Sequence, residues 1–320
     1  MTRSFVLGLA LSIAASSTVA QSYPDKLITI TVPFAPGGDI DTVARTLSGH
    51  LAGRLKQTVI IDNVAGAAGT IGTAKLAGAP PDGYRLLYSV ESTMVVAELV
   101  TPATVKYDGL KDFAPIALVA SAPLMVVAKP SFPASNLQEF LSLVKAAPGK
   151  YSYGTSGIGT SLHLAAERLA QKAGLSMVHA PYKLGPQIIT DLIGDQIDLA
   201  VMPLPSVLPY AKKVKILFSL TDRRIAELPG VDAAGDQPAT RGIEVLVWHG
   251  LFAPAATPPA VVDRLNREVN AALREPAVLR VLKERGMQPG GGAPADLRQH
   301  MQADKTRYAA IVKSLNLKLD

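Results

Sequence analysis

Two glycine-rich segments each stand between a predicted strand and a predicted helix, where a turn can bind an anion. The first runs from Pro33 to Asp41 and follows the strand-like stretch Ile28 to Val32. The second runs from Gly154 to Ser161, follows Tyr151 to Tyr153, and adds hydroxyl groups to the backbone donors. The first N–H groups of a helix have no partner inside the helix and lie at the positive end of its dipole. Each segment therefore predicts a binding place for a negatively charged group.

The donors of the first turn can be named. Because Pro36 has no N–H, Ala35, Gly37 and Gly38 must supply them. One helix start contributes up to about 2 kcal/mol to an anion, whereas micromolar binding needs about 8 kcal/mol. We therefore expect the two turns to act together, each holding one end of a small acid in a cleft. The alternative is a plain structural turn at each place, since neither segment has nucleotide-binding spacing, and Gly66 to Gly72 has the same two interpretations.

Two acidic residues have two interpretations each. Asp41 either caps the helix that follows the first turn or faces the cleft and accepts a hydrogen bond from the ligand. Glu91 either lies solvated at a rim, which we favour because glutamate is seldom buried unpaired, or lines the pocket. In the pocket it would repel a fully ionised dicarboxylate. In that case either Glu91 is protonated or the ligand carries a donor such as an amine or amide.

The candidates for catalysis and metal binding are few. His163 lies one turn into the second helix, where it points a ring N–H toward a ligand or packs locally. Ser156 or Ser161 with His163 would be the nucleophile–base pair of a secreted hydrolase, but the nucleophile-elbow spacing is missing, and Ser161 and His163 face different sides of a helix. The chain has no cysteine, and its five histidines lack metal-ligand spacing. We expect no enzyme, no metal and no cofactor.

Alternating strand and helix patterns must position these groups. Short β-branched runs alternate with segments of helical period, which predicts an α/β protein with largely parallel sheets. The predicted strands are 28–32, 58–61, 86–90, 124–128, 199–202, 214–219 and 245–248. The predicted helices follow Asp41, cover 162–169, begin at Pro258-Pro259, run over 277–285 with a stop at Gly286, and run over 295–314.

Proline clusters at 123–133 and 229–238 bracket a middle segment with its own strand–helix alternation. We expect one lobe from residues 21–123 plus 240–320 and a second from residues 124–239, with a ligand cleft between them. The chain would cross between the lobes twice. Trp248, the single tryptophan, is expected in a core near one crossing.

The N-terminus predicts export. Arg3 precedes an apolar stretch from Phe5 to Ala15 and small residues ending at Ala20, so residues 1–20 have the layout of a signal peptide cleaved near Ala20. The apolar stretch is shorter than the roughly 20 residues that span a bilayer. The net charge of +6 is spread over 320 residues without a basic run, which speaks against nucleic acid as a partner. We expect a periplasmic monomer.

An ordered set of motifs covers nearly all of the mature chain. It comprises Tyr23-Pro24, Pro33-Phe34 with Gly37-Gly38 and Asp41, 63–72, 81–84, 112–115, Gly159-Thr160-Ser161 with His163-Leu164, Pro181-Tyr182-Lys183 and 248–254. In this set the sequence resembles the extracytoplasmic receptors of the tripartite tricarboxylate transporters, the Bug family. The resemblance implies a two-lobed, type II periplasmic-binding fold that closes on carboxylates without catalysis.

The resemblance also implies ligand contacts and partners. The predicted ligand-binding residues are Phe34, Ala35, Gly37, Gly38, Asp41, Glu91, Ser92, Thr155, Ser156, Gly159, Thr160, Ser161, His163 and Met202. The chain departs from the family pattern at Glu91, where a small polar residue is usual, and at Met202 to Leu204, where acidic or amide residues are common. The implied partner is a membrane permease, and the alternative is a sensor-kinase ectodomain. The identity of the acid stays open.

Overall fold

Strands and helices alternate along the chain, and the computed structural model describes residues 23–183 and 185–315. The predicted signal peptide, residues 1–20, lies outside them. The strands are β1 (Ile28–Val32), β2 (Val59–Asn63), β3 (Arg85–Val90), β4 (Phe113–Ala128), β5 (Ser152–Thr155), β6 (Val178–Pro181), β7 (Leu199–Pro203), β8 (Lys215–Ser219), β9 (Asp232–Ala233), β10 (Leu246–Pro254) and β11 (Gln288–Gly291). The helices are α1 (Asp39–Leu55), α2 (Thr70–Ala77), α3 (Ala97–Val100), α4 (Leu137–Ala146), α5 (Ser161–Ala173), α6 (Gly185–Ile193), α7 (Leu204–Val207), α8 (Pro259–Ala272), α9 (Pro276–Glu284) and α10 (Pro294–Leu315).

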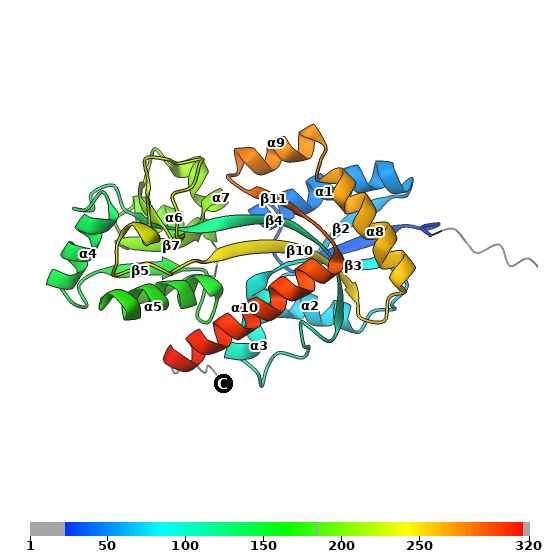
Figure 1. Ribbon diagram of the computed structural model, residues 1–320, viewed down its shortest axis with the longest axis horizontal. Coiled ribbons are helices and arrows are strands. Elements are labelled where there is room, and N and C mark those ends of the chain that lie inside the picture. The colour runs from blue at the N-terminus through cyan, green and yellow to red at the C-terminus, as the bar shows by residue number, and fades with distance from the viewer. Residues whose placement is uncertain (1–22, 184, 316–320) are drawn as a thin grey trace, which may run out of the picture.

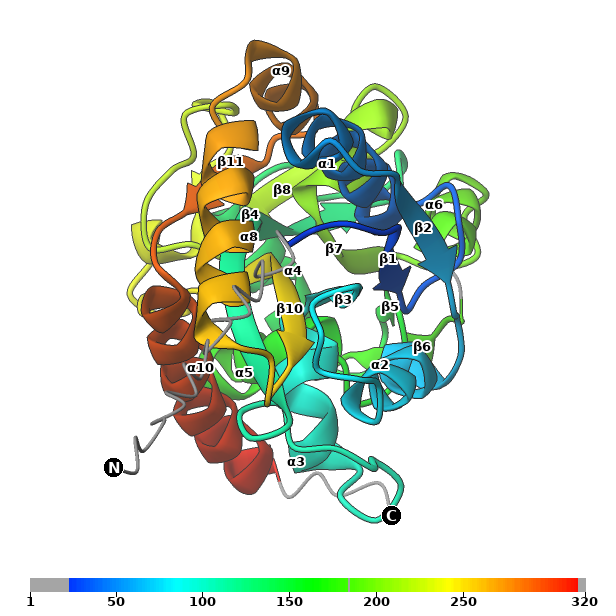
Figure 2. The same ribbon diagram turned by 90° about the vertical axis from the view of Figure 1, so that its right-hand side faces the viewer.

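The sheet has β4 and β10 in its middle and one lobe on each side of them (Figure 1). Its main strand order is β2-β1-β3-β10-β4-β7-β5-β6. Seen from the first lobe, α1 and α2 lie on opposite sides of β1 and β2 (Figure 2). The predicted two-lobed α/β fold is confirmed. Parallel pairing is limited to the outer strands β1–β3, β5–β7 and β8 with β9, because β4 and β10 pair antiparallel with each other and with their neighbours.

Strand β4 pairs with strands of both lobes. Its residues up to Pro123 pair with β10 and β11, whereas Leu124 to Ala128 pair with β7 and β8. The predicted lobe boundary after residue 123 falls on this change of partners and stays a prediction. Pro123 itself lies inside the strand and not in a turn, and Pro115 lies where the register between β10 and β4 shifts. Prolines are tolerated at such irregular places in a sheet.

Helix α1 has the buried spacing and helix α9 the stop that their sequences predict, whereas α1 begins at Asp39 and α5 extends from Ser161 to Ala173, beyond the predicted 162–169. In α1 the side chains of Val43, Leu47, Leu51 and Leu55 are all buried, which confirms the predicted four-residue spacing. Helix α9 ends just before Gly286, whose φ of 64° is the left-handed conformation expected at this stop. Within the described part of the chain, no helix combines the length and the apolar character that a membrane crossing requires.

The C-terminal helix α10 packs on β4 of the central pair and also contacts α5 of the second lobe (Figure 1). Its buried Tyr308 belongs to a core that also contains Trp248 and Phe252. Trp248 is 0% exposed and its Nε1–H donates to the Asp304 carboxylate at 2.7 Å. The prediction that this tryptophan lies in a core is confirmed.

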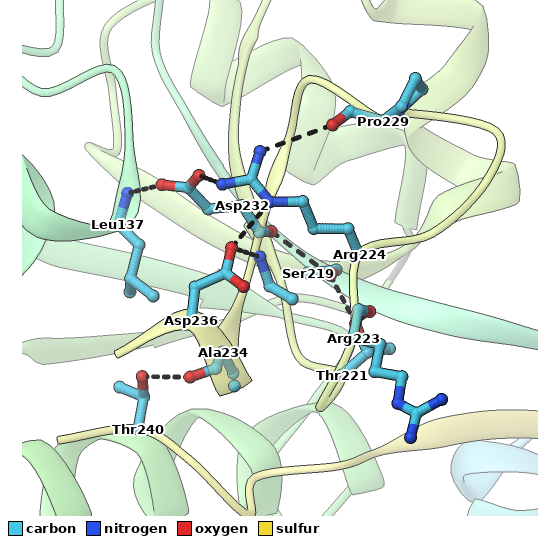
Figure 3. Close-up of polar contacts among 12 residues, drawn as sticks. Leu137, Ser219, Thr221, Arg223, Arg224, Pro229, Asp232, Ala234, Asp236 and Thr240 are labelled. Carbon is cyan, nitrogen blue, oxygen red and sulfur yellow. Dashed lines mark hydrogen bonds and ion pairs between the residues drawn. The ribbon is translucent and has the colours of Figure 1, made fainter. Parts of the chain in front are cut away.

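Residues 224–236, which precede the return of the chain to β10, are held by a cluster of ion pairs (Figure 3). The Arg224 guanidinium contacts Asp232 at 2.5 Å and Asp236 at 2.8 Å. Asp232 in turn accepts the N–H of Leu137 at the start of α4. The proline-rich stretch 229–238 is therefore tied to the second lobe by side chains, although Arg224 is 46% exposed and each pair contributes only about 1 kcal/mol or less.

Candidate functional site

Both glycine turns lie at the carboxyl ends of parallel strands, the edge at which open α/β sheets bind ligands. The first follows β1, and the loops after the parallel neighbours β2 and β3 reach the same edge. The second follows β5, beside the parallel strand β7. The strand order thus gives each lobe one glycine turn and one helix start at the carboxyl-end edge of its parallel strands.

The first turn is held by Asp41. Its carboxylate accepts the N–H of Gly37 at 2.9 Å, the Nδ2–H of Asn63 at 2.9 Å and the Nε–H of Arg45 at 2.9 Å. Helix α1 has Gly38 as its N-cap, so the predicted capping role of Asp41 is wrong, and this residue reaches back from the first turn of the helix instead. Burial raises the pKa of Asp41, but the hydrogen bonds from Arg45, Gly37 and Asn63 outweigh it and hold the pKa below its usual value.

The hydrogen bond between Gly37 and Asp41 reduces the number of N–H groups that the first turn can offer to a ligand. The N–H of Gly37, which the sequence offers as a ligand donor, is already taken by Asp41. The N–H groups of Ala35 and Gly38 have no acceptor among the described residues, and both residues are exposed. Phe34 is partly buried beside this turn and packs on the main core. Direct ligand contacts of these residues stay predictions.

Replacing Asp41 by alanine is expected to lower the free energy of unfolding by about 1–3 kcal/mol, because three donors lose their acceptor. Hydrogen–deuterium exchange across residues 33–41 should accelerate in the same variant. The matched control is Asp62→Ala, which removes an exposed pair with Lys75 at 3.3 Å and should cost less than about 1 kcal/mol. Equal stability and equal exchange in the two variants would show that Asp41 does not hold the turn.

The second turn is held in a similar way, by the side chain of His163. The N–H of Gly159 donates to Nδ1 of His163 at 3.1 Å, and Thr160 is the N-cap, accepting the N–H of His163 at 3.4 Å. The His163 ring is 5% exposed and stacks on His179, with 4.1 Å between ring centroids. The buried Thr155 hydroxyl contacts Nε2 of His179 at 2.7 Å. Burial lowers the pKa of both histidines, to about 4 for His179, so both rings are neutral near pH 7.

The start of α5 has unused donors in a buried place. The N–H groups of Thr160, Ser161 and Leu162 have no acceptor among the described residues. These three residues are 8%, 0% and 7% exposed. Buried helix starts normally satisfy these groups with a side chain, water or a ligand. The half-buried Ser156 lies in the same turn.

Glu91 connects the two lobes at this place. It follows β3, is 1% exposed, and accepts the Ser161 hydroxyl at 2.5 Å and the N–H of Trp248 at 3.0 Å. The favoured prediction of a solvated rim residue is therefore wrong. Burial raises the pKa of Glu91 to about 7, although the bonds from Ser161 and Trp248 counteract part of that effect. Near neutral pH the group exists in both protonation states.

A second contact between the lobes lies beside the first turn. Asp39, the first residue of α1, accepts the hydroxyl of Ser206 from α7 at 2.7 Å and pairs with Arg285. Ser92 is partly buried next to Glu91, and Met202 is 2% exposed in the core of the second lobe. Ligand contacts of these two residues stay predictions.

Sequence reasoning missed several residues that shape the site. Asn63 and Asp39 hold or flank the first turn, and Ser206 joins Asp39 from the other lobe. The signal available for Asn63 was its place at the carboxyl end of a predicted strand next to β1. For Ser206 the sequence carries no signal, because its partner lies 167 positions away.

The candidate nucleophile–base pair is not assembled. The Ser161 hydroxyl donates to Glu91, and Nδ1 of His163 accepts from Gly159. Nε2 of His163 lies 3.9 Å from the Glu167 carboxylate. Within residues 23–183 and 185–315, no group of three or more histidines and carboxylates is placed to hold a metal ion. The arrangement suits the binding of an anion by neutral donors.

Comparison with known proteins agrees with this geometry. The sequence model of the tripartite tricarboxylate transporter family receptor matches residues 43–317. A UPF0065 protein in the tcbD-tcbE intergenic region of Pseudomonas sp. (strain P51) is 34% identical over 320 residues, covering 98% of this chain and 95% of that protein. Protein BugT of Bordetella pertussis is 30% identical over 318 residues, covering 98% and 97%.

Solved structures extend the comparison to the whole fold. The periplasmic binding protein BugD superposes with a TM-score of 0.83 at 31% identity, covering 92% of this chain and 99% of that one. Rpa4515 of R. palustris with adipate gives 0.86 at 28% identity, covering 92% and 99%. MatC of Rhodopseudomonas palustris with bound malate gives 0.81 at 30% identity, covering 91% and 100%. This chain belongs to the family of tripartite tricarboxylate transporter receptors, as its resemblance to the Bug proteins predicts.

Proposed function

We propose that this protein is an exported, periplasmic solute-binding receptor that closes its two lobes on a small organic acid. It delivers the acid, unchanged, to the membrane components of a tripartite transporter. The observation that carries the proposal is the buried start of α5. Among the residues that the structure describes, the N–H groups of Thr160, Ser161 and Leu162 have no acceptor there, at the carboxyl-end edge of the parallel strands of the second lobe. A carboxylate is the ligand group that such a helix start favours.

The first lobe supplies the second half of the site. Ala35 and Gly38 offer N–H groups at the start of α1, and the contact of Asp39 with Ser206 brings this helix to the second lobe. Charge-assisted hydrogen bonds contribute about 1.5–3 kcal/mol each. Two helix starts with several such bonds reach the roughly 8 kcal/mol of micromolar binding. The relatives with bound adipate and malate support acids of a few carbon atoms as ligands.

A thermal-shift panel tests the proposal on the mature protein. It should include monocarboxylates, dicarboxylates, tricarboxylates, amino acids and aromatic acids. An acid at about 100 times its Kd adds about 2.7 kcal/mol to the stability, which raises Tm by several degrees. No shift with any acid, together with hydrolysis of an ester or amide that Ser156→Ala abolishes, would overturn the receptor function.

The first turn offers a matched pair of variants for this panel. Gly38 has φ −78°, which proline can adopt, and a Cβ added to it meets nothing within 4 Å. Gly38→Pro removes one N–H donor, while Gly38→Ala keeps it. We expect at least about tenfold weaker acid binding in the proline variant only. Equal affinity in the two variants would exclude the Gly38 donor from the site.

A further inference from the structure

A carboxylate of the protein itself lies between the lobes, and we propose that it selects ligands by their charge. Glu91 makes the site favour an acid with one carboxylate and, at the end beside Glu91, an uncharged polar group such as an amide, over a dicarboxylate. This inference rests on the proposed function and narrows its substrate class. It goes beyond binding of an acid, because the turns alone would accept either kind of ligand.

The position of Glu91 places its charge at the candidate site. Its Oε1 accepts the hydroxyl of Ser161, the first residue of α5, directly after the turn that offers free N–H groups. Its Oε2 accepts the N–H of Trp248 from the central strand β10. A ligand carboxylate bound at the start of α5 therefore shares that helix start with the carboxylate of Glu91. Both carboxylate oxygens of Glu91 are therefore fixed by hydrogen bonds.

The elements around Glu91 bring no cation to it. Helix α5 contributes Ser161 and the neutral His163, and β10 contributes a backbone N–H, with the neighbouring His249 hydrogen-bonded to Tyr88. None of the ion pairs of the described residues includes Glu91.

Helix α10 adds another negative charge and no direct counter-ion. Asp304 repels the ionised form of Glu91, while Arg307 and His300 of the same helix pair with Asp304 at 2.8 and 3.7 Å. The buried Tyr308 hydroxyl of this helix also feels the charge of Glu91. On α3, Glu98 pairs with Lys305 of α10 at 2.9 Å. These pairs largely balance their own charges and leave the charge of Glu91 uncompensated.

The donors offered to the ligand are neutral as well. Backbone N–H groups can stabilise one carboxylate, but they do not cancel a full second charge placed beside an ionised glutamate. An amide or hydroxyl at the ligand end beside Glu91 avoids this repulsion and can donate to the Glu91 carboxylate, while the single ligand carboxylate binds at the start of α1. Burial raises the pKa of Glu91 to about 7, so acidification neutralises it and should relax the selection.

Calorimetric titration with matched ligand pairs tests the inference. Succinate and adipate are compared with their monoamides, which differ from them by one carboxylate turned into a carboxamide. In the wild type the ratio of the Kd of the diacid to that of its monoamide should fall at least about tenfold between about pH 8.5 and about pH 6. In Glu91→Gln the ratio should be low at both pH values. Glutamine fits because its amide can accept from Trp248 and donate to Ser161.

Two further variants make the test specific. Glu98→Gln removes the same charge from the neighbouring α3 and should keep the wild-type ratio and its pH dependence. Ser161→Ala removes a bond that stabilises ionised Glu91, so the pH at which the ratio changes should move upward. A ratio that is the same in the wild type and in Glu91→Gln at both pH values would overturn charge selection while leaving the receptor function intact. Absence of binding for every acid, in every variant, would overturn the receptor function first.

Discussion

Trp248→Ala is expected to lower the free energy of unfolding by about 3–5 kcal/mol, the largest loss that we predict for a single substitution. The side chain is 0% exposed and lies in one core with Phe252 and with Tyr308 of α10. Its removal leaves a cavity and also leaves the buried Asp304 carboxylate without its 2.7 Å donor. Urea unfolding followed by far-UV circular dichroism measures the loss, since Trp248 is the only tryptophan for fluorescence.

Two controls separate the parts of this effect. Trp248→Phe keeps an aromatic ring and loses the donor, so it should cost about 1–3 kcal/mol. Tyr210→Ala truncates an aromatic side chain that is 37% exposed and should cost less than about 1 kcal/mol. If Trp248→Ala unfolded at the same urea concentration as Tyr210→Ala, the tryptophan would not hold α10 against the central strands.

The stability of the wild type relative to Glu91→Gln is expected to fall by about 3 kcal/mol as the pH rises from 4.5 to 7. Burial raises the native pKa of Glu91 from 4.5 to about 7, so in this window the folded protein binds more protons than the unfolded chain. Stability therefore decreases with rising pH, by up to about 1.36 kcal/mol for each pH unit between the unfolded and the native pKa. Below about pH 4.5 and above about pH 7 the difference should be constant.

Urea denaturation at a series of pH values gives this difference directly, because the other titrating groups are common to both proteins. Glu284→Gln, at an exposed position at the end of α9, is the matched control and should follow the wild-type curve. A parallel course of the wild type and Glu91→Gln from pH 4.5 to 7 would mean that Glu91 is not buried between the lobes in solution.

Sequence periodicity is sufficient to predict the helices and strands that bury one face. Helices α1 and α8 and strand β1 agree closely with their predictions. It fails for β4, of which it predicts only residues 124–128. Pro123 begins the proline cluster that predicts a lobe border, and Pro115 lies further inside the same strand. The strand tolerates both prolines since they lie at a register shift and at the change of strand partners. Such tolerance depends on the neighbouring strands, which the local sequence does not contain.

In the site, too, features set by neighbouring residues could be predicted, and contacts between distant residues could not. The glycine turns could be located because a strand, a turn and a helix follow one another in the sequence. The burial of Glu91 could not, because its partners Ser161 and Trp248 lie 70 and 157 positions away. The general rule that unpaired glutamate avoids burial gave the wrong answer, since two donors from distant elements meet its carboxylate.

Each glycine turn is fastened by a side chain four residues further along, Asp41 for Gly37 and His163 for Gly159. Turn and helix therefore form one stiff unit in each lobe, already shaped before any acid arrives. Little conformational entropy is then lost within the half-sites on association, and affinity depends mainly on the free energy of bringing the two lobes together. Substitutions at the central strands should for that reason tune the lifetime of the complex without reshaping the groups that touch the acid.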